Sequence, residues 1–194
     1  INHDVTLIGS GRTDAGVHAT GQVAHFESER SDIPEWNLAR AWNTLLPPDI
    51  RVQSVKKVSA DFHAQHGAKK KQYSYYIQSH PISSLAHLNG TTLHHPYPLD
   101  HDRIQSAMNT LIGTHDFKVF QAAGSKPGPT ERTIYECDAS WVDVSAPGFS
   151  PQPQTKLLRL RFVGSGFLKQ MIRSLVGTLI PIGEKSREAS LIQY

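Results

Sequence analysis

Two consecutive strand patterns followed by a strongly apolar helix pattern constrain the fold of this chain most. Segments 133–144 and 156–163 read as strands, and the proline-rich turn at 146–153 between them predicts an antiparallel hairpin. After Gly166, pairs of apolar residues recur every four positions as far as Pro181, which predicts a helix between these two residues. Strands combined with a helix that has one apolar face indicate an α+β fold.

Further elements are expected upstream of this hairpin. Leu38, Trp42 and Leu45 have the spacing of one buried helix face, with Asp32 as the N-cap of that helix. Asp100 is expected to cap a second helix in the same way. The predicted elements are strands at 5–8, 22–27, 50–58 and 72–78, helices at 34–46 and 100–113, and a loop over 80–98.

The order of these elements, ββαβ followed by βαββα, predicts two tandem ferredoxin-like halves with antiparallel sheets. Residues 1–66 would form the first half, without its opening strand and helix, and residues 67–194 the second, without its closing strand. Because both gaps fall at chain ends and Ile1 almost directly precedes a strand, we expect a fragment of a longer protein. A single mixed α+β domain with no missing parts is the alternative.

Positive charge is concentrated in two segments, although the whole chain carries a formal net charge of only +3. Residues 51–76 contain six basic residues against Asp61, and residues 154–173 contain five basic residues and no acidic one. If both segments lie on one face, that face would suit a nucleic-acid partner. The alternative is that these side chains are ordinary solvated surface.

Cysteine, hydropathy and histidine patterns restrict the class of protein further. Cys137 is the single cysteine, so no internal disulfide can form, and a reducing cytoplasmic location is expected. No apolar run approaches the roughly 20 residues that span a bilayer, so no membrane association is expected. The spacing of His63 and His66 and the pair His94 and His95 lack companion metal ligands, and we expect neither a metal nor a cofactor.

The glycine-rich stretch 9–19 is the most unusual segment of the chain. Its glycines do not have the spacing of a dinucleotide-binding fingerprint or of a P-loop, so a nucleotide cofactor is not expected. A tight loop between strands would instead hold the carboxylate of Asp14 beside the guanidinium of Arg12. Taken alone, the stretch is more typical of an ordinary Asx-type turn.

The sequence GRTDAGVHA at 11–19 resembles the signature of the tRNA pseudouridine synthase A family, and the resemblance extends over nearly the whole chain. Two departures from the family pattern are Ser165, where asparagine is frequent, and Gln72, where a basic residue is common. The further matching blocks are NTLLPPDI at 43–50, DFHA at 61–64, KQYSY at 71–75, GTHDF at 113–117, RTI at 132–134 and GFLKQMIRSLVG at 166–177.

The resemblance implies an enzyme that isomerises uridine to pseudouridine in the tRNA anticodon stem-loop, at positions 38–40, without a cofactor and as a homodimer. Asp14 would be the nucleophile or base, Arg173 its guanidinium partner, and Tyr73 the residue over the target uracil that serves as base. The implied RNA-binding residues are Arg12, Lys69, Lys70, Lys71 and Lys169.

Two other functions stay open from the sequence. One is a non-catalytic RNA-binding module or inactive fragment. The other is an aspartate-dependent glycosyl hydrolase, which is disfavoured because the sequence has no strong second acidic motif for the usual carboxylate pair.

Overall fold

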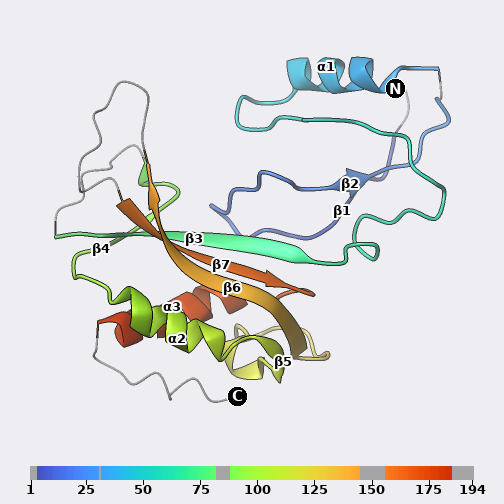
Figure 1. Cartoon of the computed structure of the whole chain (residues 1–194). Coiled ribbons are helices and arrows are strands. Elements are labelled where there is room, and N and C mark those ends of the chain that lie inside the picture. The colour runs from blue at the N-terminus through green and yellow to red at the C-terminus, as the bar shows by residue number, and fades with distance from the viewer. Residues whose placement is uncertain (1–3, 31, 82–87, 145–155, 185–194) are drawn as a thin grey trace. The chain divides into compact units, whose positions relative to one another are not determined.

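The computed structural model describes residues 4–30, 32–81, 88–144 and 156–184. The chain divides into two compact units, which are described separately below. The first comprises residues 1–13 and 19–68, and the second comprises residues 14–18 and 69–194. The α+β class predicted from the sequence is confirmed (Figure 1).

The first unit contains a short strand pair and one helix. β1 (Ile8–Gly9) pairs antiparallel with β2 (Ala24–His25), so the strands predicted at 5–8 and 22–27 are present but reduced to two residues each. α1 (Glu35–Leu45) forms close to where its periodicity predicted. The helix face expected to be buried, with Leu38, Trp42 and Leu45, is not: no α1 residue is buried, and Leu45 is 83% exposed.

Two local predictions for the first unit are wrong, and side-chain hydrogen bonds explain both. Asp32 does not cap α1, because its carboxylate pairs with the Arg30 guanidinium at 2.7 Å. The segment 50–58 is not a strand. Within it, the side-chain amide of Asn43 bonds both the N–H and the carbonyl of Val52. The Asn43 Nδ2 donates to the Val52 carbonyl at 2.9 Å, and its Oδ1 accepts from the Val52 N–H at 2.8 Å.

The second unit is built on a five-stranded sheet in the order β4-β3-β7-β6-β5. The sheet is mixed, which corrects the expectation of antiparallel sheets: β3 and β4 run parallel, and the other neighbouring strands are antiparallel. The predicted hairpin is confirmed, and the turn predicted at 146–153 lies outside the described residues. The strands are β3 (Lys71–Ser79), β4 (Leu93–His95), β5 (Gly113–Asp116), β6 (Glu131–Asp143) and β7 (Lys156–Gly164).

Helices α2 (His101–Asn109) and α3 (Met171–Gly183) lie on the same side of this sheet (Figure 1). They form one hydrophobic core with the alternate strand residues that face them. On β7 these are Leu158, Leu160 and Phe162, which are fully buried. Because β3 pairs with β7 in register, Tyr73, Tyr75 and Ile77 lie on the same face.

Several predicted boundaries in the second unit need correction. The loop expected over 80–98 contains the short strand β4, and the helix expected to reach Gly113 ends at Asn109, with β5 beginning at Gly113. α3 starts at Met171 because Gln170 adopts a left-handed conformation at φ 58°. The helix also continues past Pro181 to Gly183. Among the described residues, no helix has the length and apolar character needed to cross a bilayer.

Candidate active site

The loop that carries Asp14 is a tight turn in the second unit. The Val17 N–H donates to the Asp14 carbonyl at 3.1 Å, which closes the turn over residues 14–17. Gly16 has φ +78°, a conformation that favours glycine over every residue with a side chain. The turn leaves Asp14 exposed, so its carboxylate is accessible to a ligand.

Arg173 connects α3 to this turn. It lies in the first turn of α3, on the exposed side of the helix, away from the buried Met171 and Leu175. Its Nη2 donates to the carbonyl of Ala15 at 3.3 Å. The guanidinium therefore contacts the backbone of the residue directly after Asp14, and this bond fixes the turn relative to α3 within the second unit.

Tyr73 extends from β3 as a half-buried side chain. Its ring meets the ring of Phe167 edge to face, with centroids 5.2 Å apart and planes at 85°. Burial raises the pKa of the Tyr73 phenol, and the negative charge of Asp14 raises it further. The Asp14 carboxylate thus lies within electrostatic range of the phenol, and Tyr73 is a neutral hydroxyl at physiological pH.

The candidate lysines gather at one end of the sheet. Lys69 and Lys70 are exposed directly before β3, and Lys71, its first residue, lies opposite Gly164, the last residue of β7. The exposed Lys169 belongs to the segment that links the end of β7 to the start of α3, so it comes five residues after Gly164 in the chain. Arg12 is exposed and belongs to the first unit.

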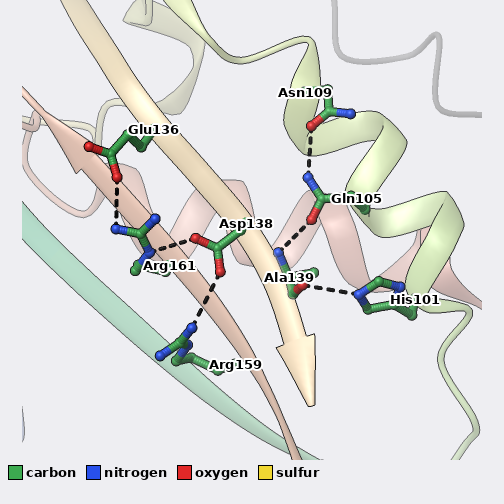
Figure 2. Close-up of polar contacts among 8 residues, drawn as sticks. All are labelled: His101, Gln105, Asn109, Glu136, Asp138, Ala139, Arg159 and Arg161. Atoms are coloured by element: carbon green, nitrogen blue, oxygen red, sulfur yellow. Dashed lines mark hydrogen bonds and ion pairs between the residues drawn. The ribbon is translucent and has the colours of Figure 1, made fainter. Parts of the chain in front are cut away.

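Part of the charge counted in the second basic segment is neutralised within the sheet. Arg161 on β7 binds Asp138 and Glu136 on β6, and Arg159 reaches Asp138 at 3.4 Å (Figure 2). These four side chains carry no net formal charge together. Of the five basic residues in 154–173, three lie outside this group: Lys156 at the start of β7, and Lys169 and Arg173 beyond its other end.

The histidines singled out in the sequence form an aromatic cluster in the first unit. The ring of His63 lies 4.8 Å from that of His25 and 4.2 Å from that of His66. Backbone N–H groups donate to Nδ1 of both His25 and His63, which occupies these atoms. Within the described ranges, no group of three or more side chains is arranged to hold a metal ion.

Two residues beside the candidate site were not assigned a role from the sequence. Phe167 contacts Tyr73, as described above, and Gly164 lies across the strand pair from Lys71. Phe167 belongs to the GFLKQMIRSLVG block, but a lone aromatic near a helix start gives no signal that it faces a particular strand residue. Only the register between β3 and β7 reveals this proximity.

Comparisons with known proteins agree with the sequence motifs. The profile of the family described as tRNA pseudouridine synthase matches residues 1–66 and 107–194. A protein of Exiguobacterium sibiricum named tRNA pseudouridine synthase A is 41% identical over 181 residues, covering 93% of this chain and 66% of that protein. A protein of the same name from Bdellovibrio bacteriovorus is 39% identical over 194 residues, covering 99% of this chain and 70% of that protein.

A third relative of that name, from Shouchella clausii, is 41% identical over 187 residues, covering 96% of this chain and 66% of its own length. The chain thus spans about two thirds of the length of the curated relatives it matches.

Proposed function

This chain belongs to the tRNA pseudouridine synthase family, and from that premise we propose that the protein isomerises uridine to pseudouridine in the anticodon stem-loop of tRNA. The observation that carries the proposal is the clustering of three motifs that are far apart in sequence. The turn at Asp14, the hydroxyl of Tyr73 and the guanidinium of Arg173 all belong to the second unit.

The reaction needs no external atoms, because it moves one bond of the nucleoside. The N-glycosidic bond of uridine breaks, the detached uracil turns, and its carbon 5 forms the new bond to the ribose. The ring nitrogen gains a proton and carbon 5 loses one. A carboxylate that serves as nucleophile or base is the group required, and Asp14 is the candidate.

Arg173 would act mainly by holding the catalytic turn. Its bond to the Ala15 carbonyl restrains the backbone beside Asp14. A base that is rearranged must leave the helix stack, so the target uridine would be flipped towards this turn.

Tyr73 would lie over the flipped uracil as a neutral phenol. Its raised pKa disfavours a resting phenolate, so a role as base would begin from the hydroxyl, which must first lose its proton. Stacking of the ring and hydrogen bonding by the hydroxyl need no such step. We therefore assign Tyr73 first to holding the uracil.

The remaining residues would bind the RNA backbone. Lys69, Lys70, Lys71 and Lys169 would contact phosphates at the end of the sheet where β3 begins, and Arg12 would contact phosphate or hold the nucleotide outside the stem. We further propose a homodimer in the cytoplasm, with residues 1–66 and 67–194 as tandem ferredoxin-like halves. The main boundary between the two compact units, at residues 68 and 69, lies close to this division, while residues 14–18 belong to the second unit.

The direct test is incubation of the protein with an unmodified tRNA transcript, followed by mapping of pseudouridine along the RNA. We expect pseudouridine in the anticodon stem-loop, and no product when the uridines of that arm are replaced by cytidines. Product at other positions would overturn the stem-loop assignment. Salt-sensitive tRNA binding without any product would instead favour a non-catalytic RNA-binding module.

A further inference from the structure

Gly164 interrupts the row of side chains with which β7 faces the helices. Leu158, Leu160 and Phe162 fill this row as buried residues, and Gly164 is the next position in it. Phe162 lies opposite Tyr73 and Gly164 lies opposite Lys71, so the empty position is the diagonal neighbour of Tyr73. A side chain from elsewhere in the chain can therefore approach Tyr73 at this point.

The ring of Phe167 occupies this position. A Cβ added at Gly164 would lie 3.2 Å from Cζ of Phe167 and 2.7 Å from the backbone oxygen of Thr133, so even alanine would force a shift. From this position the Phe167 ring meets Tyr73 edge to face at 5.2 Å. Glycine at 164 is thus what allows Phe167 to reach Tyr73.

The backbone around Phe167 is held on both sides. Before it, the Ser165 N–H donates to the Thr133 carbonyl at 2.9 Å, and the Ser165 hydroxyl accepts from the Thr133 N–H at 3.1 Å. After it, Leu168 is buried in the core and accepts the Met171 N–H at 3.1 Å. The position of the Phe167 ring is therefore set by β6 and α3.

We propose that Phe167 is a positioning residue that fixes the Tyr73 ring over the target uracil. The inference rests on the proposed function for the role of Tyr73, while the contact between the two rings stands without it. Phe167 is only partly buried, unlike the core residues Phe162 and Leu168, so one side of its ring serves the core and another contacts Tyr73. Such a contact removes rotational freedom from a side chain that must be aligned before the reaction.

The test compares Phe167→Leu with Phe167→Tyr and with a matched control, Phe120→Leu. Phe120 is a buried aromatic residue of the same unit whose ring contacts Phe117. The Tyr73 phenol is titrated by NMR with tyrosine labelled at the ζ carbon, and its resonance is identified as the one missing in Tyr73→Phe. kcat and KM for tRNA are measured in parallel.

Phe167→Leu should lower the pKa of Tyr73 towards the ordinary value of about 10. It should also reduce kcat about 10- to 100-fold while KM for tRNA changes less than about three-fold. Phe167→Tyr keeps the ring and should keep the raised pKa of Tyr73. Phe120→Leu should leave the Tyr73 titration unchanged and should not lower kcat while KM stays constant. If Phe167→Leu does not fold, Phe167→Met is measured in its place.

An unchanged Tyr73 titration in folded Phe167→Leu, or in Phe167→Met if that variant takes its place, overturns the inference. That result is independent of the proposed function, because the titration uses no RNA. Conversely, full activity of Tyr73→Ala, which removes both the ring and the hydroxyl, would refute the assigned role of Tyr73, even if Phe167→Leu shifts the titration as expected.

Discussion

At the residue scale, Tyr73 shows how the structure changes the chemistry that a motif suggests. Burial and the charge of Asp14 act in the same direction on its pKa, since both disfavour the phenolate. The KQYSY block identified Tyr73 as a site residue and implied a base. An ordinary phenol is already neutral near pH 7, and the surroundings of this ring disfavour its phenolate further.

A second residue-scale consequence concerns the histidine cluster. Burial, His66 and His25 together lower the pKa of His63 below its ordinary value. Its Nδ1 accepts N–H bonds from Gln65 at 3.2 Å and His66 at 3.1 Å, so the ring is needed in its neutral form. The pKa of His63 is lower in the folded chain than in the unfolded chain. The stability that neutral His63 contributes is therefore complete above the unfolded pKa of about 6.5 and is lost as pH falls below that value.

We predict that the turn around His63 opens in mild acid. Hydrogen-exchange protection factors of the Gln65 and His66 amides should fall when pH is lowered from about 7.5 to about 5.5. In His63→Asn, which does not titrate in this range, the change should be much smaller. His94→Asn, a substitution at an exposed histidine, should leave it unaltered. Protection independent of pH in the unaltered protein would contradict the prediction.

At the scale of elements, the sequence predicted helices and strands correctly where residues close together in the chain determine them. The hairpin of β6 and β7 and the Asp100 cap were predicted correctly, because long strands and an N-cap depend on nearby residues. The strand expected at 50–58 was wrong, and at Val52 both backbone groups bond to the side chain of Asn43 instead of to a neighbouring strand. β4 was missed because three residues carry too little pattern.

The Asp100 cap gives a prediction for α2. The Asp100 carboxylate accepts the N–H groups of Asp102 and Arg103 at 3.1 and 3.2 Å. Asp100→Ala removes both bonds and should lower the free energy of unfolding of the second unit by about 1 kcal/mol. Urea denaturation should show a lower midpoint with an unchanged slope. Asp143→Ala, at an exposed position on β6, is the control and should stay within about 0.5 kcal/mol.

At the scale of the whole molecule, charge distribution matters more than net charge. The sequence predicted two basic segments, but it could not show that Arg159 and Arg161 are paired with acidic side chains of β6 (Figure 2). That pairing depends on the register between two strands. The candidate site was therefore predictable as a set of residues from its motifs, whereas the contacts of Arg173 and Phe167 required the fold.

The charge distribution predicts which lysines bind RNA. Lys70→Gln, at the start of β3, should weaken tRNA binding and reduce the slope of log Kd against log salt by about 0.7 to 0.9. Lys156→Gln is the matched control, because Lys156 is also exposed but begins β7, at the strand end remote from Gly164. Equal effects of the two substitutions would show that the basic end of the sheet has no special role.

Single-turnover conversion of uridine in unmodified tRNA tests whether Asp14 is the catalytic carboxylate. Protein in excess over tRNA is compared with Asp14→Ala and with the control Asp143→Ala, and tRNA affinity is measured for each. We predict that Asp14→Ala loses conversion by at least about 10³-fold, while its tRNA affinity stays within about three-fold and Asp143→Ala behaves as the unaltered protein. Pseudouridine formed by Asp14→Ala at a rate near that of the unaltered protein would rule out Asp14 as the catalytic carboxylate.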